Sequence, residues 1–191
     1  GAGPRVVLGM TLYNNAQHLR ATLDSLLAQT YADFTLVLLD DASGDDTEGI
    51  AREYAARDSR IRYVRHPERK AMIATWHEVA DLAGRQCPSA EYFAWVSDHD
   101  RWLPSWLEAM VAALDRDPGL VLAYPITRRI SSDDEIALEK GPRLFETAMS
   151  GRAAITHVST QDTRTSSHGR NAASKGSAMT AVTCLPSRTS T

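Results

Sequence analysis

Cysteine is scarce in this chain of 191 residues, which has only Cys87 and Cys184. The two lie far apart and form no CxxC motif, so the sequence predicts neither a disulfide framework nor a thiolate zinc site. None of the six histidines is spaced as HxH or HxxxH, which also argues against a histidine zinc site. A reducing, cytoplasmic setting fits this composition best.

Long apolar runs and excess positive charge are also missing. No apolar run approaches the ~18–20 residues needed to cross a bilayer, and the first residues lack the basic-then-apolar layout of a signal peptide. We therefore expect no transmembrane segment and a cytoplasmic location, with peripheral attachment to a membrane left open. The net charge of -3 excludes the diffuse basic field of most nucleic-acid binders, so no nucleic-acid partner is predicted.

Charge and side-chain type divide the chain into two parts. Residues 150–191 hold five of the 21 basic residues but only one of the 24 acidic ones, and 16 of these 42 residues are serine or threonine. Their few large aliphatic side chains follow neither a helical nor a strand period, so little apolar surface can offset the entropy of ordering. We predict a folded domain over residues 1–149 and an irregular, Ser/Thr-rich tail over residues 150–191.

The domain alternates strand-like and helix-like segments. Short apolar runs predict strands, and stretches with apolar residues every three or four positions predict helices. The expected strands are Arg5–Met10, Phe34–Leu39, Ile61–Arg65, Tyr92–Val96 and Leu120–Tyr124, and the later helices are Lys70–Ala83 and Pro104–Leu114. This alternation predicts an α/β fold with a mainly parallel, Rossmann-like sheet flanked by helices. Ligands of such sheets bind beyond the carboxyl ends of the strands.

Polar clusters follow three of these strands. Residues 11–15 (TLYNN) follow the first, residues 40–46 (DDASGDD) the second and residues 97–100 (SDHD) the fourth. Adjacent carboxylates at the end of an apolar strand need partners, which a base or ribose could supply at Asp40 and Asp41. The alternative for these two residues is an Asx-type turn followed by a helix cap.

The sequence Asp98-His99-Asp100 has the D-x-D form. Mg²⁺ and Mn²⁺ prefer one or two carboxylates and keep other positions for water and phosphates, so Asp98, His99 and Asp100 are candidate metal ligands. The alternative is a solvated loop in which Asp100 caps the next helix. A D-x-D after a parallel strand also occurs in haloacid-dehalogenase phosphohydrolases, but these need a small hydroxyl residue where this chain has Trp102.

The order of these motifs resembles the nucleotide-binding half of family 2 glycosyltransferases of the GT-A fold. The resemblance covers about residues 4–125 and rests on TLYNN, SLLAQTYADFTLVLLDDASGDDT and EYFAWVSDHDRWLP. It implies that Thr11, Tyr13 and Asp41, with Asp40 beside them, hold the base and ribose of a nucleotide-diphosphate sugar. It also implies that residues within Asp98-His99-Asp100 hold a divalent cation, Mn²⁺ or Mg²⁺, that bridges the diphosphate.

Two positions depart from the family pattern. Ser97 and His99 stand where the family often has carboxylates, which leaves the identity of the metal ligand open. The start of the third helix lacks the family's Asn-x-Gly and Ala-Arg-Asn stretches. Arg69 or Lys70 can still reach a phosphate there, the alternative being a solvated helix start.

The resemblance implies inverting sugar transfer from a nucleotide-sugar donor to a glycan, lipid or protein acceptor that the sequence does not identify. A carboxylate normally removes the proton of the acceptor hydroxyl, but no family motif marks that catalytic base here. The alternative is a nucleotide-binding module that lacks the acceptor half and shows little transfer.

The aromatic residues Tyr92 and Trp95, in a predicted strand, are expected to lie in the core.

Overall fold

The computed structural model describes residues 3–125, 129–130, 136–137 and 182–185. The strands are β1 (Val6–Leu12), β2 (Phe34–Asp40), β3 (Ile61–Arg65), β4 (Tyr92–Trp95), β5 (Leu122–Ala123), β6 (Arg129–Ile130), β7 (Ile136–Ala137) and β8 (Val182–Cys184). The helices are α1 (Ala16–Leu27), α2 (Thr47–Arg57), α3 (Met72–Gln86) and α4 (Trp106–Arg116). The predicted strands and helices are therefore present, with Ile61–Arg65 unchanged and the other bounds shifted by at most three residues.

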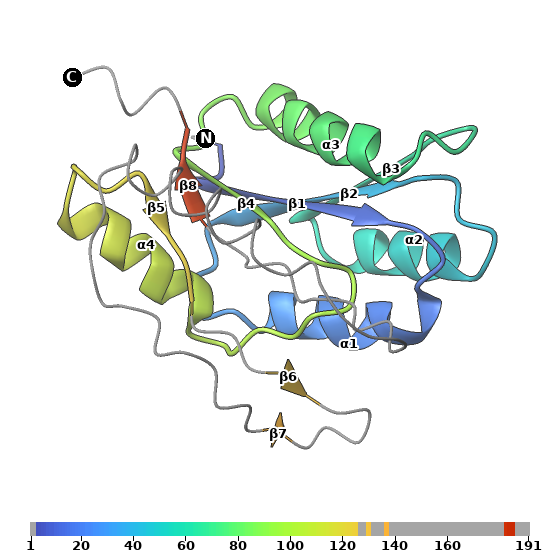
Figure 1. Ribbon diagram of the computed structural model, residues 1–191, viewed down its shortest axis with the longest axis horizontal. Coiled ribbons are helices and arrows are strands. Elements are labelled where there is room, and N and C mark those ends of the chain that lie inside the picture. The colour runs from blue at the N-terminus through green and yellow to red at the C-terminus, as the bar shows by residue number, and fades with distance from the viewer. Residues whose placement is uncertain (1–2, 126–128, 131–135, 138–181, 186–191) are drawn as a thin grey trace, which may run out of the picture.

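A six-stranded sheet with the order β3-β2-β1-β4-β8-β5 forms the centre of the molecule (Figure 1). Strands β1, β2, β3 and β4 pair in parallel, whereas β8 is antiparallel to both of its neighbours. The helices lie on both faces, with α3 on one and α1, α2 and α4 on the other. The prediction of a mainly parallel α/β sheet is confirmed.

Strand β8 was not predicted from the sequence. Its residues lie within the Ser/Thr-rich stretch, yet Val182 is fully buried and pairs with Ala94 of β4 and Ala123 of β5. Three residues are too few to show the alternation of apolar and polar side chains that marks a strand. The segment is a strand because it pairs with β4 and β5. Apart from Leu185, the rest of the predicted tail lies outside the described residues.

The sheet has one apolar cluster on each face. Leu8 and Leu36 pack with Leu23 of α1 on one face, while Val37 and Phe93 pack with Val79 of α3 on the other. Alternate side chains of a strand point to opposite faces, so the buried runs in β1 and β2 serve both clusters. Among the residues that the structure describes, no helix has the length and apolar character needed to cross a membrane.

Close packing beneath α3 depends on a glycine in β1. A Cβ atom added at Gly9 would lie 3.0 Å from the ring of Phe93 and 3.4 Å from a methyl group of Val79. The hydrogen atom at this position therefore lets Phe93 lie against β1.

A charge cluster stabilises the amino edge of the sheet. The Arg5 guanidinium donates to Asp115 at 2.6 Å and to Glu91 at 3.1 Å, and the Tyr92 hydroxyl donates to Asp115 at 2.6 Å. The Arg5 side chain is only 30% exposed, so water screens these contacts incompletely.

Replacing Arg5 with alanine is expected to lower the free energy of unfolding by about 1–2 kcal/mol, because it removes charge-assisted bonds to two carboxylates. Arg57 provides a matched control, since its side chain is 67% exposed and pairs with Glu53 one helical turn away. Arg57→Ala should change the free energy of unfolding by less than about 0.5 kcal/mol. Urea denaturation of both variants measures the difference, and equal losses would contradict the prediction.

Candidate functional site

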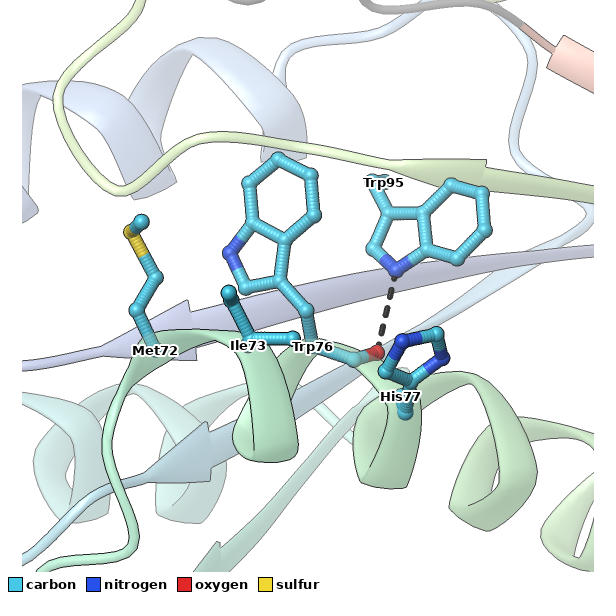
Figure 2. Close-up of a pocket in the computed structure, with 5 residues that line it drawn as sticks. All are labelled: Met72, Ile73, Trp76, His77 and Trp95. Atoms are coloured by element: carbon cyan, nitrogen blue, oxygen red, sulfur yellow. Dashed lines mark hydrogen bonds between the residues drawn. The ribbon is translucent and has the colours of Figure 1, made fainter.

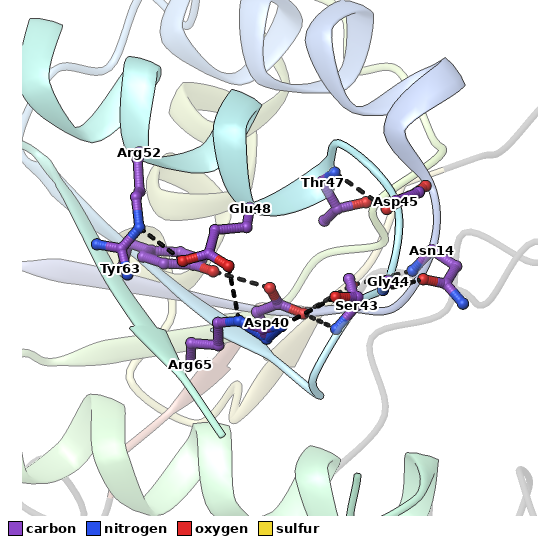
Figure 3. A network of polar contacts seen from close by, with 10 residues as sticks. All are labelled: Asn14, Asp40, Ser43, Gly44, Asp45, Thr47, Glu48, Arg52, Tyr63 and Arg65. Atoms are coloured by element: carbon purple, nitrogen blue, oxygen red, sulfur yellow. Dashed lines mark hydrogen bonds and ion pairs between the residues drawn. The ribbon is translucent and has the colours of Figure 1, made fainter. Parts of the chain in front are cut away.

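The loops that follow β1, β2 and β4 are joined by hydrogen bonds at the carboxyl edge of the sheet. The backbone N–H of Asn14 donates to the Ser43 hydroxyl at 3.0 Å, and the N–H of Gly44 donates to the Asn14 side chain at 2.7 Å (Figure 3). The Asn15 side chain, in turn, donates to the carbonyl of Asp98 at 2.9 Å. The polar clusters that the sequence placed after separate strands therefore converge.

Asp40 holds the loop after β2 in shape. Its Oδ1 atom accepts hydrogen bonds from the Ser43 N–H at 2.9 Å and the Ser43 hydroxyl at 2.6 Å, and its Oδ2 atom accepts from the Tyr63 hydroxyl at 2.8 Å. The residue is fully buried. Burial and the adjacent Asp40 carboxylate raise the pKa of Tyr63, so its phenol keeps the proton that it donates. This is the Asx-type turn that the sequence left open as an alternative for Asp40.

Ionic contacts surround the Asp40–Tyr63 pair (Figure 3). Arg65 donates to Glu48 at 2.8 Å and to the carbonyl of Ser43 at 3.0 Å, which ties the end of β3 to the loop after β2. The guanidinium of Arg52 lies 5.0 Å from the centre of the Tyr63 ring. These contacts fix the shape of the loop from outside.

Asp41 faces the opposite way and binds the turn before α3. Its Oδ1 atom lies 3.0 Å from Nδ1 of His66 and accepts from the Lys70 N–H at 2.8 Å, while its Oδ2 atom accepts from the Ala71 N–H at 2.9 Å. Burial by itself raises the pKa of Asp41. The hydrogen bonds from His66, the Lys70 backbone, Thr75 and the Ala71 backbone outweigh that effect and hold its pKa below the usual value.

The turn that Asp41 binds carries two cationic side chains. The guanidinium carbon of Arg69 lies 4.0 Å from the centre of the Tyr13 ring, and the Lys70 ammonium lies 2.9 Å from a carboxylate oxygen of Glu78. Tyr13 is 40% exposed and the Lys70 side chain 45% exposed, so a ligand can reach both. Thr11 precedes them near the end of β1, where it is opposite Leu39 of β2.

The D-x-D segment lies directly after β4. The Nδ1 atom of His99 is 2.8 Å from Oδ1 of Asp98 and 2.9 Å from the hydroxyl of Ser97. Asp98 and His99 therefore present two possible ligand atoms close together. Within the described ranges, no group of three or more His, Cys, Asp or Glu residues has the geometry of a metal site. A site built here would need additional ligands from water or a bound diphosphate, as Mg²⁺ sites commonly do.

Backbone strain is concentrated in the loops of this edge. Asn14 has φ 47°, Ala42 has φ 59° and Ala71 has φ 75°, and among the described residues these are the non-glycine positions with positive φ. Ala71, with ψ 157°, occupies a region that is otherwise nearly restricted to glycine. Such conformations cost of order 1–3 kcal/mol each and persist where surrounding contacts enforce them. For Ala71, the bond from its N–H to Asp41 is such a contact.

His66 belongs to this edge but was missed in the sequence. It follows β3 directly, is 4% exposed, and lies between Asp41 and Glu78. Polar residues after the first, second and fourth strands were predicted as site residues, but none after the third. A histidine immediately after a predicted strand was the available signal.

An apolar hollow adjoins the same edge on the α3 side of the sheet. Met72, Ile73, Trp76, His77 and Trp95 line a space of about 370 Å³. The indoles of Trp76 and Trp95 lie side by side (Figure 2). Their ring centres are 6.3 Å apart, and Nε1 of Trp95 donates to the carbonyl of Trp76.

Tyr92 is fully buried as predicted, but Trp95 is 38% exposed, so the prediction that it lies in the core is wrong. Its strand ends there, and α3 covers only part of its ring.

The comparisons with known proteins agree on one family. Residues 8–177 match the family model described as Glycosyl transferase family 2. Over 116 residues, or 60% of this chain, the sequence is 34% identical to the putative glycosyltransferase EpsE of Bacillus subtilis. It is 29% identical over 120 residues to the putative glycosyltransferase EpsH of the same organism. The matched regions cover 40% and 33% of those relatives, so this chain spans well under half of their length.

Solved structures show the same fold at low sequence identity. A mannosyltransferase from Pyrobaculum calidifontis, solved in complex with GDP-Man and Mn²⁺, aligns with a TM-score of 0.57 and 24% identity over 66% of this chain and 36% of that one. The TarS protein of S. aureus, solved with UDP, aligns with a TM-score of 0.51 and 20% identity over 59% of this chain and 32% of that one. The sheet thus has the GT-A arrangement, and the chain belongs to glycosyl transferase family 2.

Proposed function

We propose that this chain binds a nucleotide-diphosphate sugar at the carboxyl edge of its sheet and that it forms the donor half of an inverting glycosyltransferase. The observation that carries the proposal is the convergence of three strand-end loops through Asn14, Ser43, Asn15 and Asp98. The structural neighbours solved with GDP-Man and with UDP support a nucleotide ligand. Residues 1–149 would make up this domain together with β8, which pairs with β4 and β5, and the other residues of 150–191 would form a tail.

The nucleotide would lie across the loops after β1 and β2. Tyr13 offers an exposed ring to the base and Thr11 a hydroxyl. Asp41 is 3% exposed and its Oδ1 already accepts two bonds, so it would reach the base or ribose through the acceptor position that the Ala71 N–H leaves on Oδ2. Asp40 would contribute through the loop shape that Ser43 and Tyr63 fix, because its own oxygens already accept bonds from these residues. Lys70 would supply positive charge to a phosphate in competition with Glu78.

Asp98, His99 and Asp100 would hold a divalent cation, Mn²⁺ or Mg²⁺, beside the diphosphate. Asp98 Oδ1 and His99 Nδ1 lie 2.8 Å apart in a hydrogen bond that they would exchange for contacts with the ion, and the neighbour solved with Mn²⁺ supports this choice. When bound, such a cation neutralises charge on the departing diphosphate. Asp98 would also face the nucleotide.

The transfer itself would be a single displacement. The acceptor oxygen forms the new bond to the anomeric carbon while the bond from that carbon to the diphosphate breaks, and a carboxylate takes the proton of the acceptor hydroxyl. No described residue is assigned as that base. A nucleotide-binding module without turnover remains the second candidate, and a cytoplasmic location, with or without peripheral membrane attachment, fits either one.

Calorimetric titration with UDP, GDP, TDP and CDP, each with Mn²⁺ and with EDTA, tests the proposal. We expect one or two of the four to bind in Mn²⁺ and to bind much more weakly in EDTA, because the acidic domain repels an uncompensated diphosphate. A folded chain that binds none of the four in Mn²⁺ would overturn it. Sugar release from the matching nucleotide-sugar then separates an enzyme from a binding module.

A further inference from the structure

We propose that His66 is a positioning residue for nucleotide binding, which acts by holding Asp41 and the turn from Arg69 to Ala71 in place. The inference rests on the proposed function, because it concerns the same site. Nothing in the sequence motifs of the family resemblance includes this residue, and the case for it comes from its contacts.

The backbone holds His66 firmly. Its N–H donates to the carbonyl of Asp40 at 2.9 Å, which continues the pairing of β3 with β2 by one residue. The side chain is only 5% exposed, so the ring cannot turn out into water without moving the strand end. Its orientation between β2 and α3 is therefore set by the fold.

Each ring nitrogen of His66 faces a carboxylate. Nδ1 lies 3.0 Å from Oδ1 of Asp41 and forms a hydrogen bond with it. Nε2 lies 3.2 Å from Oε2 of Glu78 but is not aligned for a hydrogen bond. A carboxylate only accepts, so the proton on Nδ1 belongs to the bond with Asp41. A neutral ring then turns a lone pair toward Glu78, whereas a protonated ring presents N–H groups to both carboxylates.

The charged groups around the ring come from three elements. Asp41 lies at the end of β2, Glu78 lies on α3, and Lys70 in the preceding turn shares the Oε2 atom of Glu78 at 2.9 Å. His66 and Lys70 therefore share the Glu78 carboxylate, and a phosphate that binds the Lys70 ammonium leaves Glu78 to His66.

The donors to Asp41 link this ring to the ligand-facing turn. Besides His66, they include the N–H groups of Lys70 and Ala71, and Ala71 is held in a strained conformation. The same turn carries Arg69 over the ring of Tyr13. Without His66, the Asp41 carboxylate loses the one donor that lies outside the turn. The carboxylate can then rotate, and its bonds to the Lys70 and Ala71 N–H groups no longer hold the turn in a fixed place.

The test compares His66→Ala, His66→Asn and Glu78→Gln with a matched control, His18→Ala, whose ring is exposed on α1. The asparagine amide can donate to Asp41 from the place of Nδ1 but cannot reach Glu78. We expect His66→Ala to weaken binding of the cognate nucleoside diphosphate by about tenfold in calorimetry, as for a lost bond to a charged group, and His66→Asn to stay within about threefold. His18→Ala should bind as the wild type does.

Rescue by the conservative variant supplies a readout that a purely structural role would not move. His66→Asn restores the donor to Asp41 but not the packing of the ring, so recovery of affinity without recovery of stability assigns the effect to that bond. Glu78→Gln keeps the bond between His66 and Asp41 and should not weaken binding. Nucleotide affinity of folded His66→Ala within about twofold of the wild type would overturn the inference, as would failure of His66→Asn to restore it. If His66→Ala does not fold, His66→Gln, whose amide takes the place of Nε2 and not of Nδ1, replaces it in the comparison with His66→Asn.

A third measurement separates this inference from the proposed function. Hydrogen exchange at the Lys70 and Ala71 amides should be about tenfold faster in His66→Ala than in the wild type and should recover in His66→Asn, with no nucleotide present. Unchanged exchange at both amides would overturn the positioning role. A wild-type chain that binds none of the four nucleotides would instead overturn the proposed function, and with it the binding part of this inference.

Discussion

Replacing Asp98 and Asp100 together with alanine is expected to abolish the dependence of nucleotide binding on Mn²⁺ or Mg²⁺. In wild type, a cation bound at the end of β4 would offset diphosphate charge that the acidic domain otherwise repels. Loss of residues that only support metal ligands costs about 10- to 100-fold in metal affinity, so loss of two candidate ligands should cost at least about 100-fold. Calorimetry with the cognate nucleotide in Mn²⁺ and in EDTA measures this effect.

The control for that experiment removes two carboxylates that lie away from the candidate site. Asp33 and Asp81 are exposed and lie outside the three loops, so the double variant Asp33→Ala, Asp81→Ala changes the net charge equally. It should keep the full response to Mn²⁺. Equal wild-type affinity in Mn²⁺ and EDTA, or an unchanged response in the Asp98, Asp100 variant, would refute the assignment of the cation to this loop.

Replacing Asp41 with alanine is expected to weaken nucleotide binding by roughly 10- to 150-fold, the range for a lost hydrogen bond to a charged group of about 1.5–3 kcal/mol. The substitution also leaves the N–H groups of Lys70 and Ala71 without their acceptor, so part of the loss comes from a looser turn. Asp41→Asn keeps an oxygen for one of these donors. It should therefore be less stable than wild type but more stable than Asp41→Ala.

The lowered pKa of Asp41 fixes the direction of its pH dependence. A carboxyl group whose pKa is lower in the folded state stabilises the protein above its unfolded pKa, and that stabilisation is lost as the pH falls through the folded value. Asp41→Asn should remove this part of the acid sensitivity in urea denaturation below about pH 4.

Asp58 provides the control for Asp41, because its pKa is also lowered, here by Arg60, and it lies at the amino edge of the sheet. Asp58→Asn should change acid stability and leave nucleotide affinity unchanged. Folded Asp41→Ala protein that binds the cognate nucleotide as tightly as wild type would refute the role of Asp41.

The strands of the sheet were predictable because burial on both faces leaves a continuous apolar run, as in Phe34–Leu39. The contacts at the starts of the helices were harder to predict. Asn15 stands at the N-cap position of α1, yet its side chain donates to the carbonyl of Asp98 and makes no capping bond to its own helix. Whether a polar side chain at such a position caps the helix or binds a neighbouring loop depends on residues that are distant in sequence.

The division of work between Asp40 and Asp41 shows the same limit. Both close β2, and the sequence offered each a choice between a turn and a ligand. Asp40 stabilises the turn after β2, because Tyr63 of β3 lies beside it and donates to it. Asp41 binds the segment before α3, because His66 and Ala71 face it. These partners lie 22 or more residues away, so no local pattern encodes them.

Strand β8 also sets the order in which the sheet can form. The parallel strands β1 to β4 are complete in the chain by Trp95, but β4 and β5 share no pairing with each other and both pair with residues 182–184. Contacts between segments so distant in sequence form slowly, since the chain between them must first be closed into a loop. Among the described residues, β8 is the strand that covers this edge of β4, so the edge lacks this partner until Val182–Cys184 have been synthesised. A chain that stopped before Val182 would lack this cover, and the edge of β4 could then pair with another molecule.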